Sequence, residues 1–387
     1  MLILNLNLKM KSYLITGLAI LLFSCEKNNS IIDVSDKSNT LKIIEAEKAT
    51  QNMSAISFCV VKGDSLIWSG ALGEANKSTS TKATTDTRFI IASLSKAVTT
   101  VAVLKLAESN LLNLDADINT YLPFKVINPN FPTMKITTRM LLNHTSSISD
   151  DNYKRYDFYC WNEDCSTPLG TFLKDFYDKN GQFYSNTNFY NYQPGSQAMY
   201  TNLGFTLLGY IVERVANKPF DEYCKQAIFL PLRMTKTEWR IKNVPLNELA
   251  VPYSPTITSS TPHYTFPDYP DGGLRTTPTD ISKFMRMLMN NGIYNKNKIL
   301  SPQTINLMRQ RTSSVSTPIG TLNFGLGLYY LNFKGKELYG HGGNELGTST
   351  EMCFDPTSKV GVIVFTNTTN PQLDLIVYSL YKYGVAQ

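Results

Sequence analysis

The sequence predicts an α+β fold in which strands open and close the chain and helices fill the middle. Residues 56–73 contain two β-rich runs joined at Lys62-Gly63-Asp64, which is typical of a hairpin. The last third of the chain returns to β-rich runs at residues 324–333, 337–340, 349–355 and 360–367. Because consecutive strands joined by short turns pair antiparallel, we expect an antiparallel sheet.

Helices are predicted where apolar residues recur at helical spacing between recognisable caps. The pattern that starts at Ser93 has a broad apolar face and continues to about Ser109. Thr277-Pro278-Thr279-Asp280 places a threonine cap before proline and an acid in the first turn, and Asn291-Gly292 ends this helix. Further helices are predicted at residues 136–143, capped by Thr137 or Thr138, at 202–217, from Ser301-Pro302, and at 373–383.

The composition indicates an ordinary globular protein. A chain of 387 residues is long enough for one large domain or two intermingled subdomains, and its 42% hydrophobic and 18% charged residues show no signature of disorder. The formal charge of +6 becomes +4 when Lys9 and Lys11 are removed with residues 1–24. Basic residues form no dense run, so nucleic acid is not expected as a partner. We also find no internal repeat and no sign of an obligate protein partner.

The N-terminus is interpreted as a targeting segment. Lys9 and Lys11 precede an apolar run, Tyr13 to Phe23, that is too short to span a bilayer. The run leads into Leu22-Phe23-Ser24-Cys25, which resembles a bacterial lipobox, so cleavage before Cys25 and lipidation of its sulfur are expected. A plain secretory signal is the alternative, and both interpretations export the protein. The predicted organisation is a signal peptide at residues 1–24, a polar tether at 25–45 and a folded domain at 46–387.

Five cysteines follow Cys25, and two of them lie close together in the sequence. Cys160 and Cys165 flank Trp-Asn-Glu-Asp, and export permits a disulfide between them, whereas the alternative is two unpaired thiols in a loop. The three histidines are not spaced for sharing a metal ion with these cysteines. We therefore predict no metal site.

Ser93 and Lys96 form the first candidate pair for chemistry. They lie three residues apart at the first turn of a predicted helix, so their side chains share one face. The helix N-terminus adds unpaired N–H groups and partial positive charge, and a nearby amine can make a serine hydroxyl nucleophilic. The same Ser-x-x-Lys pattern also starts at Ser24 and Ser379, so the spacing alone is not specific.

Tyr200 and Asn202 form a second candidate group, because they follow a Pro-Gly turn and open a predicted helix. Tyr200 can accept the Ser93 proton if Lys96 stabilises its phenolate. Asn202 can orient Lys96 or a substrate amide. The Tyr-x-Asn pattern also occurs at Tyr184 and Tyr330. Tyr184 is the real rival, since Tyr330 lies in an aromatic strand repeat typical of packing.

Gly340-His341-Gly342-Gly343-Asn344 follows a predicted strand and is the third candidate group. Gly342 and Gly343 let a peptide-like substrate approach this edge closely. A backbone N–H near Asn344 and that of Ser93 can form an oxyanion hole. His341 can donate a hydrogen bond to a carboxylate or a leaving group, although a plain turn feature is the alternative.

Residues 150–200 are rich in aromatic side chains and show little periodicity. Aromatic rings of this kind bury large areas and also bind ligands. The segment is therefore expected either to wall a substrate groove or to cover the helical part of the fold.

In this order, these stretches resemble the serine β-lactamase and penicillin-binding-protein superfamily. The nearest branch holds class C β-lactamases, D-alanyl-D-alanine carboxypeptidases and family VIII esterases. The resemblance covers residues 46–387 and implies an α+β fold with a five-stranded antiparallel sheet flanked by helices, plus an all-α subdomain at about residues 110–264. It is carried by Phe89-Ile90-Ile91-Ala92-Ser93-Leu94-Ser95-Lys96, residues 111–115, residues 136–146, Gln193-Pro194-Gly195, Tyr200-Thr201-Asn202, residues 272–277 and Gly340-His341-Gly342-Gly343.

The resemblance also implies a role for each candidate residue, and it implies no cofactor. His144 lies in a recurring stretch of the family, and we interpret it as structural. The implied roles are Ser93 as acylated nucleophile, Lys96 as its proton partner, Tyr200 as general base and acid, Asn202 as an orienting group, and His341 in the place where many members carry lysine.

The chain departs from the family at His341-Gly342-Gly343, where true β-lactamases of this group usually have Lys-Thr-Gly. A fixed ammonium binds a β-lactam carboxylate well, whereas histidine titrates near neutrality and is a weaker anchor. Peptidase and esterase members tolerate histidine there, so efficient β-lactamase activity is not expected.

The sequence thus predicts an exported serine hydrolase that faces the periplasm or cell surface and is held at the membrane by a lipid on Cys25. It would cleave an amide or ester bond of a small molecule or peptide through a Ser93 acyl-enzyme. A D-amino-acid peptide of the cell wall and an ester are both open as substrates. The alternatives are a class C type β-lactamase and an idle binding or sensing protein on the same fold.

Overall fold

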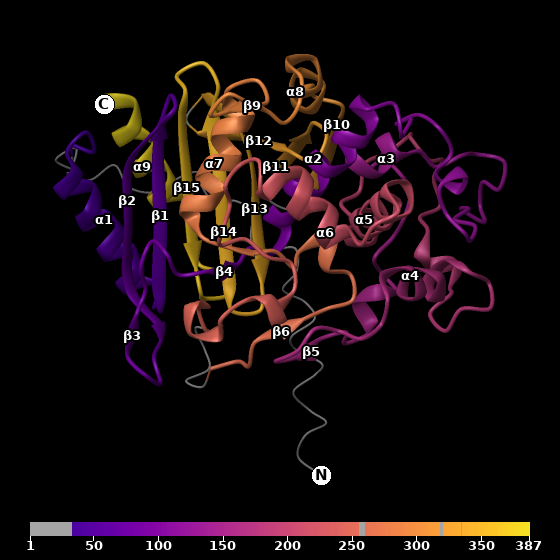
Figure 1. Ribbon diagram of the computed structural model, residues 1–387, viewed down its shortest axis with the longest axis horizontal. Coiled ribbons are helices and arrows are strands. Elements are labelled where there is room, and N and C mark those ends of the chain that lie inside the picture. The colour runs from indigo at the N-terminus through magenta and orange to yellow at the C-terminus, as the bar shows by residue number, and fades with distance from the viewer. Residues whose placement is uncertain (1–32, 255–259, 318–319, 334) are drawn as a thin grey trace, which may run out of the picture.

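Figure 1 shows the computed structural model, which describes residues 33–254, 260–317, 320–333 and 335–387. One large sheet has the strand order β10-β11-β12-β13-β14-β15-β1-β2-β3, and the pairs β4–β7, β5–β6 and β8–β9 lie outside it. The strands are β1 Ala55–Lys62, β2 Ser65–Asn76, β3 Thr81–Lys82, β4 Phe89–Ile90, β5 Cys160–Trp161, β6 Tyr264–Thr265, β7 Arg275–Thr276, β8 Ile293–Tyr294, β9 Asn297–Lys298, β10 Ser313–Thr317, β11 Gly320–Phe324, β12 Tyr329–Phe333, β13 Lys336–Glu345, β14 Thr348–Asp355 and β15 Val360–Thr366.

The structure confirms the predicted helix starts at Thr277 and Ser301 and selects Thr137 over Thr138, whereas Thr201 is a cap that was not predicted. Thr137, Thr201, Thr277 and Ser301 each accept a backbone N–H with the side-chain oxygen at the start of a helix. The α-helices are α1 Lys37–Thr50, α2 Ser95–Glu108, α3 Thr138–Leu142, α4 Leu169–Tyr177, α5 Asn202–Ala216, α6 Phe220–Cys224, α7 Pro278–Met289, α8 Pro302–Arg309 and α9 Asp374–Ala386, with a short 3-10 turn, η1 Ala92–Leu94, before α2.

The predicted α+β fold with an antiparallel sheet flanked by helices is confirmed. The strands from the two ends of the chain meet at the centre, where β1 pairs antiparallel with β15. Among the described residues the sheet has nine strands rather than five, because β10, β11 and β12 extend one edge and the two-residue β3 extends the other. The predicted strand 324–333 is interrupted, since Gly325 donates its N–H to Leu328 and Gly327 adopts a positive φ of 63°.

Helices cover both faces of the sheet, and the strand pattern explains why. On β1, Phe58 and Val60 pack in one core with residues of α9, whereas Cys59 and Val61 pack in the other core with residues of α2 and α7. Alternate side chains of a strand point to opposite faces. A strand that is buried on both faces therefore has a continuous run of apolar residues in its sequence. Figure 1 shows α7 in front of the sheet and the helical part, with α3 to α6, beside it.

The expected polar tether at residues 25–45 is corrected by helix α1. This helix begins at Lys37, and Asp36 caps it by accepting the N–H of Asn39 at 2.9 Å. Ile44 is completely buried in the core that also contains residues of α9. The many polar residues of α1 concealed its helical character, because tertiary packing rather than composition stabilises such a helix. Cys25 and the predicted signal peptide lie outside the described residues.

The predicted membrane anchor is the lipid on Cys25, which lies outside the described residues. None of the helices in the described ranges combines the length and the apolar character that a membrane span requires.

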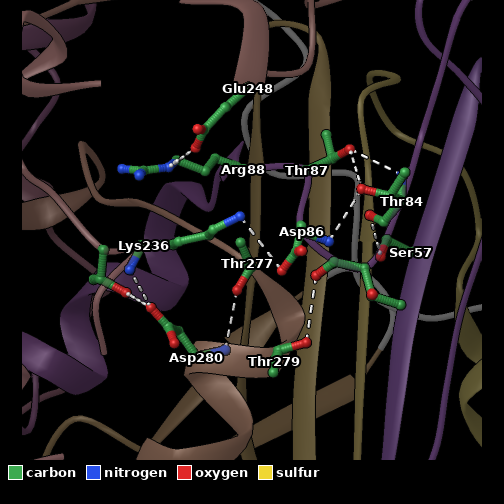
Figure 2. Close-up of polar contacts among 12 residues, drawn as sticks. Ser57, Thr84, Asp86, Thr87, Arg88, Lys236, Glu248, Thr277, Thr279 and Asp280 are labelled. Carbon is green, nitrogen blue, oxygen red and sulfur yellow. Dashed lines mark hydrogen bonds and ion pairs between the residues drawn. The ribbon is translucent and has the colours of Figure 1, made fainter. Parts of the chain in front are cut away.

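A polar network anchors the segment that leads into β4 (Figure 2). Arg88 donates its backbone N–H to the Glu248 carbonyl at 2.8 Å, and their side chains form an ion pair at 3.2 Å. Asp280, in the first turn of α7, accepts the N–H of Lys236 at 2.7 Å, and Thr277 caps the same turn. The network ties three segments together just before the strand that carries the chain to Ser93.

Candidate active site

Ser93 lies in the 3-10 turn η1, directly after the short strand β4 and before α2. Threonines of β14 hold this turn: Thr348 donates its hydroxyl to the Ile90 carbonyl at 2.8 Å, and Thr350 donates to the Ile91 carbonyl at 2.9 Å. Ala92 has a positive φ of 47°, which is a strained conformation for a residue with a Cβ. The fold therefore enforces an unusual backbone directly before Ser93.

Lys96 joins three segments of the protein through its ammonium group. Its Nζ donates to Ser93 Oγ at 3.0 Å, to Asn202 Oδ1 at 2.8 Å and to the Asp271 carbonyl at 2.8 Å. These three acceptors use all three hydrogens of an ammonium. The side chain is completely buried, so the three bonds replace the water that it loses on folding.

The surroundings of Lys96 keep it charged. Burial disfavours the ammonium, but attraction from the oxygens of Tyr200 and Asp271 outweighs burial and raises the pKa of Lys96. The Nζ also lies 5.1 Å from the centroid of the Tyr200 ring. A charged Lys96 is a hydrogen-bond donor to Ser93 and a positive charge beside Tyr200.

Tyr200 and Asn202 are positioned by a residue that the sequence analysis missed. The buried carboxylate of Asp150 accepts the Thr201 hydroxyl at 2.7 Å, the Asn202 N–H at 2.6 Å and the Leu203 N–H at 3.2 Å. It therefore accepts hydrogen bonds from backbone N–H groups at the start of α5 that have no partner within the helix. Asp150 is 50 residues upstream of Tyr200, and no local pattern connects it with that helix.

The ring of Tyr200 is held by aromatic neighbours. His144 packs against it at a tilt, with ring centroids 4.4 Å apart, and Nδ1 of His144 accepts the N–H of Thr201 at 3.3 Å. Asp271 was also missed, because its contribution to the site is a backbone carbonyl. A backbone acceptor has no side-chain signal in a sequence.

Strand β13 has a free edge beside Ser93. Its pairing with β12 ends at Gly340, while its pairing with β14 continues to Glu345. A Cβ added to Gly343 would lie 2.4 Å from the Ile91 carbonyl oxygen and 2.8 Å from the Ser93 nitrogen. Only glycine permits this approach. The structure thus brings the strand that carries Asn344 against the turn η1, which carries Ser93.

Gly342 is also required by its surroundings. A Cβ there would lie 2.5 Å from Glu351 Oε2 and 2.6 Å from the Tyr329 hydroxyl. Tyr329 donates to the Glu351 carboxylate at 2.9 Å, and burial raises the pKa of that carboxyl to about 8. This pair fills the space that a side chain at position 342 would need. Asn344 accepts the hydroxyl of Ser349 through its side-chain oxygen.

His341 lies on β13 with 2% of its surface exposed. Its Nδ1 is 2.6 Å from the Gly342 carbonyl oxygen, and because a carbonyl only accepts, Nδ1 carries the proton. Nε2 is then an acceptor without a partner among the described residues. Burial and the nearby charge of Lys96 lower the pKa of His341 to about 3. The expectation that His341 titrates near neutrality and donates to a carboxylate is therefore wrong.

The rival residues lie elsewhere. Tyr184 is in the turn after α4, where its N–H bonds to the Gly181 carbonyl at 3.2 Å. Tyr330 packs against Tyr339 within the sheet, with the rings tilted and their centroids 5.0 Å apart. Ser379 is buried in α9, and Ser24 lies outside the described residues.

Cys160 and Cys165 form a disulfide, which settles the alternative left open by the sequence.

In the aromatic segment, Phe158, Phe172 and Phe176 pack on one another and cover the helical part. Tyr159 instead reaches Glu345 at the end of β13. The phenylalanines thus fulfil the expectation that rings cover the helical part, while a role of the segment in walling a substrate groove stays a prediction. In the part of the chain that the structure describes, no group of three or more His, Cys, Asp or Glu side chains is arranged to hold a metal ion.

Comparison with known proteins identifies the family. The Beta-lactamase family matches residues 41–380, and the chain belongs to this family. Protein flp of Staphylococcus aureus (strain N315) is 25% identical over 350 residues, which cover 88% of this chain and 64% of flp. The chain thus spans less than two thirds of the length of this relative.

Two solved structures share the fold. A D-amino acid amidase from Ochrobactrum anthropi SV3, complexed with L-phenylalanine, matches with a TM-score of 0.72 at 20% identity over 89% of this chain and 98% of that chain. The octameric penicillin-binding protein homologue from Pyrococcus abyssi matches with a TM-score of 0.69 at 23% identity over 89% and 76%. Membership of the Beta-lactamase family supports a serine hydrolase in general.

We expect none of the three imidazoles to titrate between about pH 5.5 and 8 in the folded protein, although a free imidazole titrates near 6.5. Burial lowers the pKa of His263 to about 4, that of His341 to about 3, and that of His144 well below its usual value. Because the unfolded chain binds these protons first, folding stability decreases as pH falls below about 6.5. An NMR titration of the ring protons checks this, with the urea-unfolded protein as control. A folded-state midpoint above about 5.5 contradicts it.

Replacement of Gly343 by alanine should slow acylation of Ser93 roughly 100-fold, because a new Cβ pushes β13 away from the nucleophile turn. The rate of labelling by a fluorophosphonate measures this effect. Gly335→Ala is the control for backbone strain alone, since its φ of 83° disfavours a side chain, whereas a Cβ there meets nothing within 4 Å and is not at the turn of Ser93. Equal labelling rates for Gly343→Ala and the unchanged protein contradict the close approach.

Proposed function

We propose that the protein is a serine hydrolase that cleaves an amide or ester bond through an acyl-enzyme on Ser93. The observation that carries the proposal is the buried ammonium of Lys96, which donates at once to Ser93 Oγ and to Asn202 Oδ1. Maintaining a completely buried charge costs several kcal/mol, and proteins keep such groups chiefly at functional sites.

The reaction follows from the arrangement of the side chains. Ser93 Oγ attacks the substrate carbonyl carbon as its proton passes to the Tyr200 oxygen, which Lys96 stabilises by charge. The N–H groups of Ser93 and Asn344 bind the oxyanion. The bond to the leaving group breaks as Tyr200 returns the proton to it. Water then attacks the ester on Ser93, and its hydrogens are shared between the acid product and the restored serine.

We propose a D-amino-acid amide or peptide, or an ester, as substrate rather than a β-lactam. The His341 ring is neutral, so β13 offers no fixed cation for a β-lactam carboxylate. The Tyr329–Glu351 pair excludes a threonine side chain at position 342. The similarity to a D-amino acid amidase supports the same choice.

We also propose that the enzyme is exported and held at the membrane through a lipid on Cys25. The Cys160–Cys165 disulfide supports this, because structural disulfides persist outside the reducing cytosol.

Ser93→Ala should abolish covalent labelling by a fluorophosphonate, because the hydroxyl oxygen forms the bond. Intact mass of residues 26–387 measures the adduct, and a parallel incubation with a penicillin reports whether a β-lactam also acylates the site. Ser379→Ala is the matched control, since it removes the serine of the other Ser-x-x-Lys pair in the described chain. No adduct on the folded protein, or an adduct that survives Ser93→Ala, contradicts the proposal and favours a binding protein on this fold.

Cys25→Ala should remove a fatty-acid label that the cells incorporate into the full chain, because the thiol of Cys25 is the acceptor. Labelling with radioactive palmitate in a bacterial host, followed by gel analysis, checks this. Cys353→Ala, which changes a buried free cysteine, should keep the label. Persistent labelling of Cys25→Ala contradicts the lipid anchor.

A further inference from the structure

Carboxylates outnumber cations around the nucleophile. Lys96 is influenced by Asp150 and Asp271, and it in turn influences Glu345. Asp268 is completely buried and close enough to affect Asp271. Within the described residues, no ion pair includes Asp268, Asp271 or Glu345. The site therefore has an excess of acidic groups over its one ammonium.

This excess has a measurable electrostatic consequence. Burial, followed by the neighbouring carboxylates, raises the pKa of Asp268 to about 6, and the pKa of Asp271 lies well above its usual value, mainly through burial. Crowded carboxylates resist ionisation because no cation balances them. A positive charge that enters the site would stabilise their ionised forms, so the site favours a cationic ligand over an anionic one.

Glu345 is the carboxylate best placed to meet such a ligand. It is the last residue of β13 and lies two residues beyond Gly343, so its side chain shares the face that meets the Ser93 turn. The Tyr159 hydroxyl donates to Glu345 Oε1 at 2.5 Å, and the Leu346 N–H donates to the same oxygen at 2.9 Å. Among the described residues no donor bonds to Oε2, which leaves one oxygen for a ligand.

His341 provides an independent observation on the same face of the strand. Its ring is 2% exposed, and Nε2 accepts no hydrogen bond within the described chain. Beside Lys96 this face therefore carries acceptors rather than cations, namely the buried Nε2 of His341 and Oε2 of Glu345. A substrate with N–H donors complements such a wall, whereas a carboxylate finds no partner on it.

The order of groups along β13 assigns a side of the substrate to Glu345. His341 lies beside Tyr200, the group that protonates the leaving group, with ring centroids 6.5 Å apart. In the proposed mechanism the N–H of Asn344 binds the oxyanion, and Glu345 is the next residue along β13, on the side away from His341. Glu345 therefore faces the acyl portion of the substrate.

We propose that Glu345 binds a free ammonium group on the acyl side of the substrate, so that the enzyme acts on aminoacyl amides or esters with an unblocked amine. The inference rests on the proposed hydrolase function and specifies its substrate class. Tyr159 positions the carboxylate, and it is itself held by the Cys160–Cys165 loop and by packing on Tyr264 at 5.0 Å. The hydrogen bond from Tyr264 to the Leu346 carbonyl at 2.6 Å fixes the same corner.

The test compares the p-nitroanilides of D-alanine and L-alanine with their N-acetyl derivatives. For the alanine enantiomer that is turned over faster, kcat/KM should be about 10- to 100-fold higher for the free amine than for the acetylated form. Glu345→Gln keeps an acceptor for Tyr159 but removes the charge. It should lower kcat/KM for the free-amine substrate and leave that for the acetylated one, so that the ratio falls to about one. Glu337→Gln, which changes an exposed acid of the same strand, should leave the ratio unchanged.

Fluorophosphonate labelling of Ser93 separates the two proposals, because this reagent carries no amine. If Ser93 is labelled but blocked and free amines react equally, or none of the four substrates reacts, the role of Glu345 is overturned and the hydrolase proposal stands. An unchanged ratio in Glu345→Gln overturns it as well. If Ser93 is not labelled in the folded protein, both proposals fail.

Discussion

The buried ammonium of Lys96 is the interaction on which the rest of the site depends. Its three acceptors are Ser93 in the turn η1, Asn202 at the start of α5 and the backbone carbonyl of Asp271. A completely buried charge is tolerated only when every hydrogen is bonded, so these three segments must be in place together. Asp150 adds a second constraint, because it fixes the start of α5 and therefore Asn202. The sheet side and the helical side of the protein are thus joined through one charged group.

The sheet contributes rigidity and a free edge. Thr348 and Thr350 hold the backbone before Ser93, and the strained Ala92 shows that the surrounding structure determines this turn. Gly343 allows the edge of β13 to approach the same turn without a Cβ. A nucleophile held in this way does not need to be reorganised when a substrate binds, which is the physical basis of catalysis by preorganised groups. The polar network in Figure 2 anchors the segment that enters the turn.

The charges of the site restrict its substrates. One ammonium faces several buried carboxylates, and the neutral His341 adds an acceptor rather than a cation. In a medium of low polarity such an imbalance acts over longer distances than in water. A neutral ring at position 341 gives β13 an acceptor where a lysine would give it a fixed cation. We therefore expect the charge of the pocket to influence which substrates this site accepts.

The sequence by itself determined the fold class, the helix cap at Thr277 and the residues around Ser93, because periodicity and capping are local properties. It did not show that α1 begins at Lys37, since that helix is stabilised by packing against α9. It also did not show Asp150, the Asp271 carbonyl or the neutral state of His341. Each of these depends on which groups lie within a few ångströms and on how much water is excluded. Only the tertiary structure decides such distances, because they join residues that are far apart in the chain.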